Sequence, residues 1–466
     1  MKHIFKTLVL LAGLLTSASA FTFTHPGLLS STEELEFVKA KIAQGAQPWT
    51  SDLSMMMRNT SLVNRTPHVT ATMNATTGES AARDDAQGAY YQALLWYYTG
   101  DTTYANKSIA IMNAWATTFT GFQSTDLQRQ LLTGWIGSIF PLAAEIMRSY
   151  PQWSSTDIAQ FSSMLNSAFL PTLTPGNATY NGNWELTMIN AMMAIAIFNE
   201  DTTTMNKAIS MWRTRVPEYF YMTSDGAKPI LPAGTSLSYW FNGVLVDGLC
   251  QETCRDNGHH MQFGFASAIN VAEMAHHQGI DLYTENQARL TTTMELHARM
   301  LAENTMLHVC ANDTPTVDHY DTWEIAYNQY HNRMGQNLPW TDSLIRVMIR
   351  PYGTRYSWNI LLETFTHADV DSNASTAIRN FQASDRDQFA MIRNNAVELQ
   401  APHAGIFAVT TNKLNGQFVS QIQISAHAGQ SVHIPLPLAQ MATGMYVIHI
   451  STETGNTTLL YMRQKQ

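Results

Sequence analysis

The sequence is poor in cysteine and in charge. It has three cysteines in 466 residues, too few for a disulfide scaffold, and the odd number leaves at least one unpaired. Cys250 or Cys254 can form one bridge to Cys310, and the sequence leaves open whether this bridge forms. Charged residues make up 14% of the chain and the formal net charge is -9, which argues against a nucleic-acid partner. A local cationic site for an acidic substrate remains compatible with this balance.

Long apolar runs are absent beyond the first twenty residues. There, Lys2 and Lys6 precede an apolar run from Leu8 to Leu15, and Ala18-Ser19-Ala20 fits a signal-peptidase site. No later segment approaches the roughly 18 apolar residues that a membrane span requires. We therefore expect a signal peptide at residues 1–20 and a mature protein without a membrane span, secreted or at the cell surface.

Helical patterns without a fixed repeat period fill the chain from residue 32 to residue 350. The runs are separated mostly by Gly, Pro or Asp-Thr turns and include residues 32–42, 86–98, 104–119, 127–147, 156–170 and 185–198. Residues 185–198 are apolar almost all round, which predicts an inner, fully buried helix. Short gaps between many of the runs predict antiparallel neighbours.

After residue 375 the pattern changes to short segments rich in Val, Ile, Phe and Tyr, with turns such as Asn415-Gly416. These segments are residues 389–399, 405–411, 417–424, 431–437 and 445–451. We therefore expect a mainly α domain at residues 21–375 and a small all-β sandwich at residues 386–466. The β module holds no cluster of acids, bases or metal ligands, so the chemistry is expected in the helical domain.

The stretch CRDNGHHMQFG, Cys254 to Gly264, concentrates titratable residues. On a helix, one stripe contains Arg255, His259, Gln262, Ala266, Asn270, Glu273 and His277. A solvated outer face is the general explanation of such stripes, but outer faces usually carry Lys and Glu, whereas this one carries residues that recognise ligands and transfer protons. Asp256 and His260, at i and i+4, predict an aspartate that fixes the tautomer of a histidine.

Metal binding is an alternative use of the same segment. Glu273 and His276 have the spacing of carboxylate-bridged di-metal sites, but the sequence has no second Glu-x-x-His. His259 and His260 are adjacent and point apart on a helix, unlike zinc-binding pairs at i and i+4. We therefore expect neither a metal nor another cofactor.

Two further clusters supply asparagine, tyrosine, histidine and arginine. In YNGNWE, Asn183 precedes the buried helix and is either a helix N-cap or a catalytic residue. The stretches YNQYHNR (Tyr327 to Arg333) and WNILLETFTH (Trp358 to His367) form the second cluster. The expected substrate-binding residues are Tyr180, Asn181, Trp184, Glu185, His260, Gln262, Arg333, Trp358 and His367.

These residue types match β-elimination on a uronic-acid chain. That reaction requires neutralisation of the C5 carboxylate, removal of the C5 proton and protonation of the leaving O4. Asn and Arg can donate hydrogen bonds to the carboxylate. A neutral His, or a Tyr whose pKa is lowered, can remove the proton, and Tyr can protonate O4. None of these steps requires a metal.

Several blocks between Phe21 and Asp371 resemble the alginate lyase family of polysaccharide lyases, in particular its mannuronate and glucuronan lyases. They are FTHPGLLSSTEELEFVKAKIAQGAQPW, DDAQGAYYQALLWYYTGD, NGNWELTMINAM, QETCRDNGHHMQFGFASAINVAEMAHHQGIDLY and EIAYNQYHNRMG. The resemblance implies an (α/α) toroid with a central groove that cleaves an acidic polysaccharide such as alginate, polymannuronate or glucuronan by metal-independent β-elimination.

The resemblance also implies roles for individual residues. Asn183 is expected to neutralise the carboxylate, with Arg255 as its charged helper and His259 as the base or a second neutraliser. Related lyases carry a catalytic tyrosine a few residues after the arginine, where this chain has Phe263 and Phe265. The proton donor is therefore expected elsewhere, at Tyr327 or Tyr330, with Tyr180 as the next candidate.

The β module resembles the C-terminal sorting domains of the type IX secretion pathway, on the blocks LNGQFVSQ and IPLPLAQMATGMYVIHISTETGNTTLLYMRQ. This resemblance implies that secretion machinery is a partner of the protein. A carbohydrate-binding or spacer sandwich is the alternative.

Two other functions fit parts of the pattern. A glycoside hydrolase on a helical barrel needs two carboxylates facing each other across a groove, and Glu185, Asp256 and Glu363 are candidates. A non-catalytic oligosaccharide-binding protein would use aromatic residues such as Trp184 and Trp358 to stack on sugar rings.

Overall fold

The computed structural model describes residues 21–463 except for residues 75, 124–127, 316–319, 354–355, 359, 371–389, 394, 402, 414–417, 442–443 and 453–455. The predicted signal peptide, residues 1–20, lies outside the described residues. Residues 371–389 also lie outside them, so the predicted domain boundaries at residues 375 and 386 stay predictions. In the part of the chain that is described, no helix is both long and apolar enough to cross a membrane.

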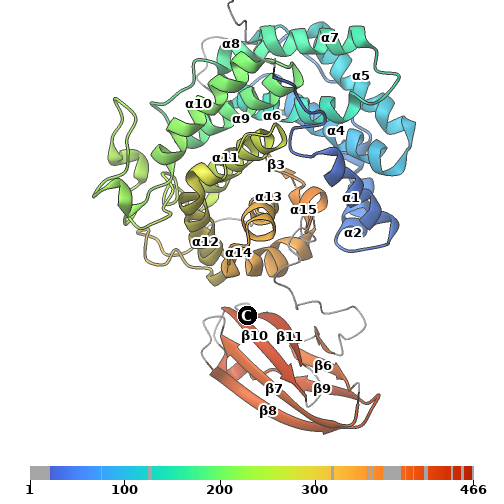
Figure 1. The fold of residues 1–466 in the computed structure, drawn as a ribbon, viewed down its shortest axis with the longest axis vertical. Helices are drawn as coiled ribbons and strands as arrows, with labels where there is room; N and C mark the ends of the chain where they lie inside the picture. The colour runs from blue at the N-terminus through green and yellow to red at the C-terminus, as the bar shows by residue number, and fades with distance from the viewer. Residues whose placement is uncertain are drawn as a thin grey trace, which may run out of the picture.

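Helices dominate the first part of the chain and are arranged in an incomplete ring (Figure 1). The α-helices are α1 (Thr32–Ala43), α2 (Trp49–Arg58), α3 (Thr60–Val63), α4 (Glu79–Thr99), α5 (Thr102–Thr118), α6 (Arg129–Met147), α7 (Ser155–Met164), α8 (Leu170–Leu173), α9 (Gly182–Phe198), α10 (Thr202–Tyr219), α11 (His259–His277), α12 (Gln287–Glu303), α13 (Glu324–Tyr327), α14 (Pro339–Leu344) and α15 (Glu363–His367). The short strands β1 (Thr72–Met73) and β2 (Gly121–Phe122) pair in parallel, and β3 (Tyr356–Ser357) pairs with β4 (Ile360–Leu361).

Local sequence explains where several helices begin and end. Before α1, the Ser31 hydroxyl accepts a hydrogen bond from the Glu34 amide, and the Glu34 carboxylate accepts one from the Ser31 amide, which is a capping box. Asp101 and Asp201 cap α5 and α10 through their carboxylates. Helix α4 ends at Gly100, whose φ of 73° is a left-handed conformation that glycine adopts without steric cost.

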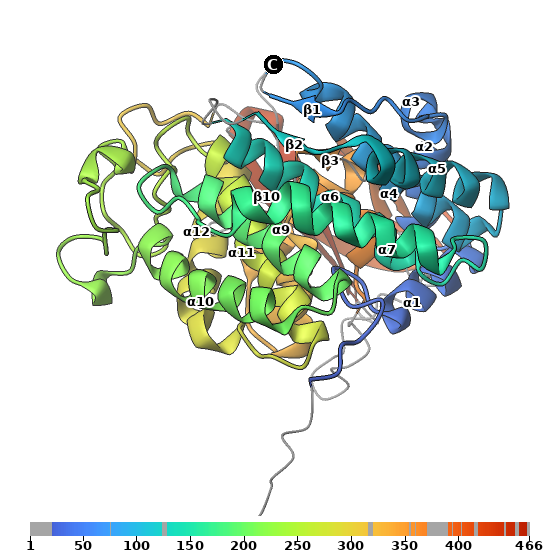
Figure 2. The same cartoon turned by 90° about the horizontal axis from the view of Figure 1, so that it is seen from above.

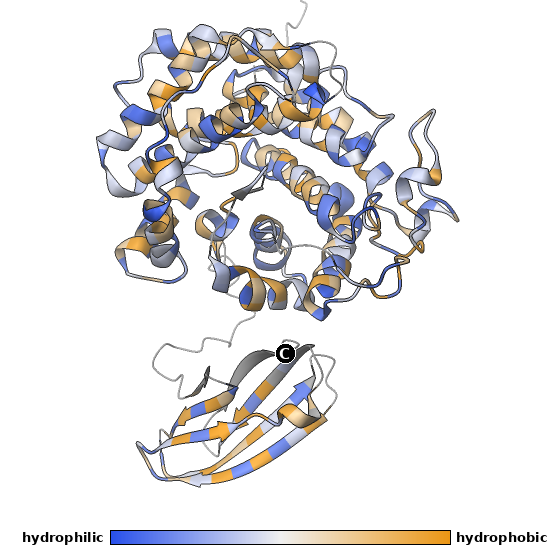
Figure 3. Cartoon of the chain, turned by 180° about the vertical axis from the view of Figure 1, so that it is seen from behind, coloured by the Kyte–Doolittle hydropathy of each residue, from blue (hydrophilic) through white to orange (hydrophobic). Residues whose placement is uncertain are grey.

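Helix α9 is the inner helix of the domain. All of its residues are buried, as the apolar run predicted, and it packs against α6, α10 and α11. Figure 2 shows these helices next to one another, and Figure 3 shows that the inner helices carry long apolar stretches. Because α9 is packed on all sides, a polar residue at its N-terminus is held in a fixed position.

The connection between α10 and α11, residues 220–258, projects from the ring and contains only short 3-10 turns (Figure 1). Tyr221, Trp240 and Leu249 form a separate small core with residues that follow α12. A disulfide joins Cys254 to Cys310 across a sequence separation of 56 residues, and Cys250 is buried and unpaired. The bridge that the sequence left open is therefore present.

The C-terminal module consists of two antiparallel sheets. Strands β11 (Asn456–Arg463), β10 (Gly444–Ser451), β7 (Gly405–Lys413) and β8 (Phe418–Ala426) form one sheet, and β5 (Ala390–Arg393), β6 (Ala396–Gln400) and β9 (Ser431–Pro435) form the other. Apolar residues of both sheets, including Val397, Phe407 and Ile448, form a separate core. The predicted fold class, an (α/α) toroid followed by a small β-sandwich, is confirmed.

Two strands differ from the sequence prediction. The segment 389–399 was expected as one strand, but it is a hairpin of β5 and β6, in which Arg393 pairs with Ala396. Asn395 permits this turn because it adopts the left-handed conformation, with a φ of 61°. Strand β11 was not predicted as a separate strand.

Candidate active site

The first turn of α9 is capped by the segment that precedes α11. The Gly182 amide donates to Gln251 Oε1 at 2.6 Å, and the Asn183 amide donates to Glu252 Oε2 at 3.1 Å. Asn183 Nδ2 also donates to Glu252 Oε1 and Oε2, at 2.7 and 2.6 Å. The residue at the N-cap position is Asn181, so the N-cap interpretation of Asn183 is wrong. Instead, Asn183 uses its side chain to join α9 to Glu252.

Arg255 contacts the same carboxylate. Its Nη1 donates to Glu252 Oε1 at 2.7 Å, and the Arg255 side chain is 30% exposed whereas Glu252 is fully buried. Arg255 does not lie on α11, because Gly258 takes a left-handed N-cap conformation with φ 101° and the helix begins at His259. The predicted stripe therefore starts at His259, and Arg255 combines a buried anchor with an accessible guanidinium that suits an anion.

His259 pairs with a tyrosine that the sequence prediction did not include. The Tyr320 hydroxyl lies 2.8 Å from His259 Nδ1, and both side chains are partly buried. The Phe263 ring packs against both, with centroid distances of 5.1 Å to His259 and 5.3 Å to Tyr320. An imidazole and a phenol in direct contact are the two groups that proton removal and proton donation require.

Gln262 positions this pair and is buried, so the structure gives it a supporting contact, and its expected contact with substrate stays a prediction. Gln262 Oε1 accepts a hydrogen bond from the Tyr320 amide at 3.2 Å, and its Nε2 donates to the Gly258 carbonyl at 3.1 Å. The amide thus joins the segment before α13 to the start of α11. It fixes the backbone from which the Tyr320 side chain extends.

Asp256 and His260 form the pair that their spacing predicted. The Asp256 carboxylate hydrogen-bonds His260 Nδ1 and accepts the His260 amide at 3.0 Å. Burial acts to raise the pKa of the Asp256 carboxyl, but the hydrogen bonds and charge of His260 outweigh it and hold that pKa below its usual range. Asp256 therefore stays ionised and orients the His260 ring beside His259, at a centroid distance of 4.9 Å.

An aromatic group follows Asn183 directly. The Trp184 ring lies 4.4 Å from the Tyr180 ring, and Tyr239 of the projecting connection lies 6.2 Å from Tyr180 between ring centroids. Tyr180 is 37% exposed, while Trp184 is 8% exposed. The exposed ring faces that remain suit a sugar ring.

A second aromatic group lies next to the His259 and Tyr320 pair. Trp358 packs with Phe263 and Tyr320 in one small apolar cluster. Trp358 also stacks on Trp135 at 4.2 Å, and the Arg83 guanidinium lies 4.2 Å above the Trp358 ring. Trp358 therefore lies next to Tyr320, and its expected contact with substrate stays a prediction.

Tyr327 and Tyr330 do not lie at this site, and the structure gives no support to their expected role as proton donors. The Tyr327 hydroxyl donates to Asp342 at 2.7 Å, and the Tyr330 hydroxyl lies 3.4 Å from the Tyr283 carbonyl. The side chains are 2% and 0% exposed, and burial raises the pKa of both phenols. Both therefore belong to the core.

Glu185 is also structural. Its carboxylate accepts the Asn177 amide at 2.9 Å and lies 3.3 Å from Arg215 Nε, and Arg215 is 1% exposed. Arg215 in turn donates to the Tyr180 carbonyl at 3.1 Å. The pair braces the loop before α9 from within, and the structure gives no support to the expected contact of Glu185 with substrate. Asn181, also expected to bind substrate, is 5% exposed.

Arg333 and His367 lie against the N-terminal segment. Arg333 donates to Glu34 at 2.8 Å and to Glu273 at 3.1 Å, and His367 Nε2 lies 2.7 Å from the Leu29 carbonyl. These contacts hold the first described residues of the chain against the ring. The structure therefore gives no support to the expected substrate contacts of Arg333 and His367.

Glu34, Glu273 and His277 form the cluster of possible metal ligands found among the described residues, with ligand atoms within 4.8 Å of one another. Arg333 pairs with both carboxylates, and His277 Nε2 lies 3.1 Å from Glu34 and 3.5 Å from Glu273. Burial disfavours the charged imidazole, but the two carboxylates raise the pKa of His277 to about 9. The cluster is therefore a buried network of two anions and two cations.

The polar stripe of α11 thus has two ends with different partners. Gln262, Asn270 and Glu273 are all buried, which excludes a solvated outer face. His259, at the N-terminal end of α11, contacts Tyr320, and His277, at the C-terminal end, belongs to the buried ion network.

The carboxylates proposed for a hydrolase have separate partners. Glu185 braces Arg215, Asp256 orients His260, and Glu363 accepts the Ile325 amide at 3.3 Å. Burial and the nearby Asp321 raise the pKa of Glu363, which is 3% exposed. The structure therefore gives no support to a pair of these carboxylates facing each other across a groove.

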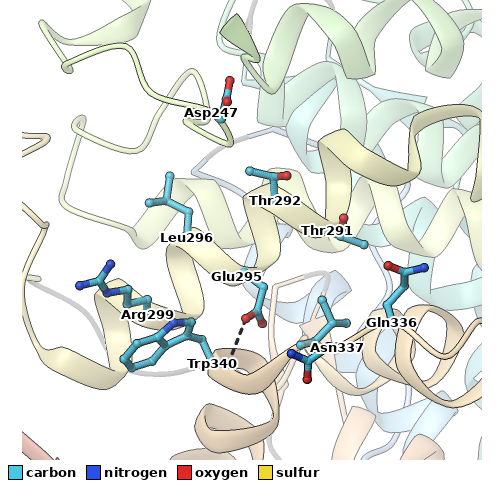
Figure 4. A pocket seen from close by; sticks show the side chains of 10 residues that line it. Asp247, Thr291, Thr292, Glu295, Leu296, Arg299, Gln336, Asn337 and Trp340 are labelled. Carbon is cyan, nitrogen blue, oxygen red and sulfur yellow. Dashed lines mark hydrogen bonds between the residues drawn. The ribbon is translucent and has the colours of Figure 1, made fainter. Parts of the chain in front are cut away.

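A cavity of about 390 Å³ lies between α12 and the start of α14 (Figure 4). Trp340, Arg299, Glu295 and Asp247 line it, and none of the residues described above does. Glu295 caps α14 by accepting the Trp340 and Thr341 amides, at 3.1 and 2.9 Å. Two acids against one base give a lining that disfavours a polyanion, so the geometry around His259 is the better candidate for the active site.

The sequence prediction did not include Glu252, Tyr320, Tyr239 or Tyr219, whose hydroxyl donates to Glu252 Oε2 at 3.1 Å. Glu252 stands three residues before Arg255 in the QETCRD block, a spacing that suits an ion pair. Tyr320 belongs to no periodic segment, and its partner is 61 residues away in sequence. Only the Glu252 contact with Arg255 had a local signal.

Comparison with known proteins finds a family model that matches part of the chain and solved structures with a similar fold. Residues 39–230 match the model of the alginate lyase family. A histidine-to-alanine variant of alginate lyase A1-III in its apo form is 14% identical over 73% of this chain and 97% of that chain, with a TM-score of 0.52. A tyrosine-to-phenylalanine variant of that lyase, complexed with a tetrasaccharide, is 12% identical over 73% of this chain and 96% of that one, with a TM-score of 0.53. No curated protein matches the chain.

Proposed function

We propose that the protein is a polysaccharide lyase that cleaves a uronic-acid polymer by metal-independent β-elimination, a proposal supported by the match of residues 39–230 to the alginate lyase family model. Alginate, polymannuronate and glucuronan are the substrates that this proposal covers. The observation that carries it is the direct contact between His259 and Tyr320, together with the accessible guanidinium of Arg255 shortly before His259 in the sequence.

Substrate binding begins with the uronate carboxylate. Arg255 offers the N–H groups that do not point at Glu252, and Asn183 supplies an amide N–H beside them. Hydrogen bonds from these donors stabilise the negative charge that develops on the carboxylate when the C5 proton leaves. Charge-assisted hydrogen bonds of this kind are about twice as strong as neutral ones.

Proton transfer follows at the tyrosine and histidine pair. His259 takes the proton from C5, a double bond forms between C4 and C5, and the C4–O4 bond breaks with its electron pair on O4. Tyr320 protonates O4 of the leaving chain. The hydrogen bond between the two side chains then lets the proton gained by His259 restore the Tyr320 phenol. Every step uses side chains of the protein.

The aromatic groups hold the sugar rings on either side of the reacting bond. Tyr180 packs on Trp184, the residue after Asn183, and on Tyr239, while Trp358 lies next to Tyr320. Aromatic faces stack on the apolar C–H faces of pyranose rings, which positions the chain without adding charge.

The test is incubation of the purified protein with polymannuronate, polyguluronate and glucuronan in the presence and absence of EDTA. We expect new ultraviolet absorbance from the unsaturated product with at least one polymer, and the same rate with EDTA. New reducing ends without this absorbance would indicate a hydrolase. Binding of the oligosaccharides without product over long incubation would indicate a binding protein.

We also propose export from the cell, with the C-terminal sandwich as the sorting signal. The charged and apolar pattern of residues 1–20 supports a signal peptide. Expression in a bacterium that has type IX secretion, with and without residues 386–466, tests this. Release into the medium that does not depend on the module would contradict its role in sorting.

A further inference from the structure

We propose that Glu252 is a positioning residue of the elimination reaction, which holds the Asn183 amide and the Arg255 guanidinium in one orientation toward the substrate carboxylate. This inference rests on the proposed function. Glu252 lies too deep to contact substrate, because none of its surface is exposed. Its effect must therefore pass through the groups that it binds.

Four donors from three segments converge on the Glu252 carboxylate. They are the Asn183 backbone amide at 3.1 Å, Asn183 Nδ2 at 2.6 and 2.7 Å, Arg255 Nη1 at 2.7 Å and the Tyr219 hydroxyl at 3.1 Å. A buried carboxylate is costly unless such donors surround it. Its place at the N-terminus of α9 lowers that cost further, because the helix dipole favours a negative charge there.

The carboxylate decides which way the Asn183 amide points. A carboxylate accepts hydrogen bonds and donates none, so the amide nitrogen, not the amide oxygen, must face Glu252. Seen from Asn183 Nδ2, the directions to the two Glu252 oxygens are much closer together than the directions of the two N–H bonds of Nδ2. One N–H therefore points between Oε1 and Oε2, and the second is left to point elsewhere.

Arg255 is fixed in the same way. Its Nη1 is anchored on Glu252, which leaves the rest of a planar and rigid guanidinium on the part-exposed side. Two donors that are both bound to one buried carboxylate keep a constant separation from each other. Two groups that bind the substrate carboxylate during catalysis need a constant separation, since displacement of a catalytic group by about 1 Å can reduce the rate about 100-fold.

Tyr219 supports Glu252 through the hydrogen bond that its hydroxyl donates to Oε2. A Cβ at Gly182 would lie 2.2 Å from Tyr219 Cδ2, and a Cβ at Gly264 would lie 2.5 Å from the Tyr219 hydroxyl. Both glycines thus leave room for the phenol to reach the carboxylate. Burial and the charge of Glu252 raise the pKa of Tyr219, which keeps its hydroxyl a donor.

The experiment compares Glu252→Gln with the wild type on the best uronan. Glutamine keeps the shape, but one of its terminal atoms becomes a donor that faces other donors. We expect kcat to fall at least about tenfold, with a smaller change in KM, because the displaced groups act mainly on the charge of the transition state.

Glu145→Gln is the matched control. Glu145 is a buried glutamate on α6 that pairs with Arg148 at 3.2 Å and with His25 at 2.9 Å, outside the candidate site. We expect both Glu145→Gln and Glu252→Gln to lower the thermal midpoint, because each removes a buried charge. Only Glu145→Gln should leave kcat within about twofold of the wild type. Tyr219→Phe removes a single donor from Glu252 with little change of shape, and we expect a several-fold loss of kcat.

The outcomes separate the inference from the proposed function. Wild-type kcat and KM in folded Glu252→Gln would overturn the inference and leave the lyase function intact. If Glu252→Gln does not fold, wild-type kinetics of Tyr219→Phe would overturn it instead. A wild type that forms no unsaturated product from any uronan would overturn the function and the inference together.

Discussion

At the scale of single residues, Tyr320 is the strongest test of the proposed chemistry. Tyr320→Phe removes the hydroxyl that lies 2.8 Å from His259 and keeps the ring that packs on Phe263. We expect kcat to fall by about 100-fold or more, because general acid catalysis contributes about 10² to 10⁴. The rate of ultraviolet absorbance measures kcat, and KM should change little.

Tyr327→Phe is the comparison for that variant. It removes a hydroxyl that donates to Asp342 in the core. Its cost should appear in the thermal midpoint and not in kcat. A loss of activity in Tyr327→Phe together with normal activity in Tyr320→Phe would return the proton donor to the position that the sequence suggested.

Sequence reasoning found the residues of the site that stand in dense polar motifs. Asn183, Arg255 and His259 lie in the NGNWE and CRDNGHH blocks. Tyr320 was missed because its contact with His259 joins residues 61 positions apart, and Glu252 was missed because it reaches Asn183 across 69. No local pattern reports contacts that only the tertiary fold creates.

At the scale of elements, the C-terminal end of α11 should make stability depend on pH. The pKa of His277 is raised to about 9 by Glu34 and Glu273, so its stabilising effect is complete below its ordinary value of 6.5 and is lost as pH rises through 9. The pKa values of both glutamates are lowered, despite burial, by His277 and Arg333, so their effect is lost as pH falls below 4.5. We expect unfolding to become easier on both sides of this range.

His277→Gln tests the alkaline side. The wild type should lose on the order of 3 kcal/mol of unfolding free energy between pH 6.5 and pH 9.5. The variant should be less stable at pH 6 and should show a flatter dependence above it, in urea unfolding followed at several pH values. His276→Gln, at the exposed neighbouring residue, is the control and should keep the wild-type slope.

The disulfide is a second element that can be tested. The Cys254–Cys310 bridge closes a loop of 56 residues, which corresponds to roughly 4 kcal/mol in the chain-entropy description. Asn257 Nδ2 also binds the Asn312 and Thr314 carbonyls at 3.0 and 2.7 Å, next to the bridge. We expect the Cys254→Ala, Cys310→Ala double variant to lose thermal stability and part of its activity. Cys250→Ala, without a disulfide to lose, is the control.

Helices and strands were predicted well where the apolar residues of a segment follow a single spacing. Helix α9 is apolar on every side and was expected as a buried helix, and its structure agrees. The stripe of α11 was placed one turn too early, because Gly258 starts the helix after Arg255. The hairpin of β5 and β6 was read as one strand, since both halves carry the same β-forming residues.

At the scale of the whole molecule, the two cores should behave independently in catalysis. The C-terminal sandwich has its own apolar core, and every residue of the candidate site lies in the helical domain. A protein shortened after residue 370 should keep kcat within about twofold, because domains with separate cores usually fold alone. Contacts between α12 and β10 would be lost, and activity lost with them would show that the module supports the ring.

The order of the two parts along the chain followed from the change of period, from helical spacing before residue 375 to short apolar segments after residue 386. The arrangement of the helices into a ring did not follow from any single segment. It depends on contacts such as those of Arg333 with Glu34 and of His367 with Leu29, whose partners are 299 and 338 residues apart in sequence.

The packing of Tyr219 between two glycines also limits how this site can change. Its ring occupies the space that a side chain at residue 182 or residue 264 would need. These three positions, from three different helices, therefore have to vary together. A relative with a larger residue at either glycine position must carry a smaller one at the tyrosine position, and its buried carboxylate must then find another donor.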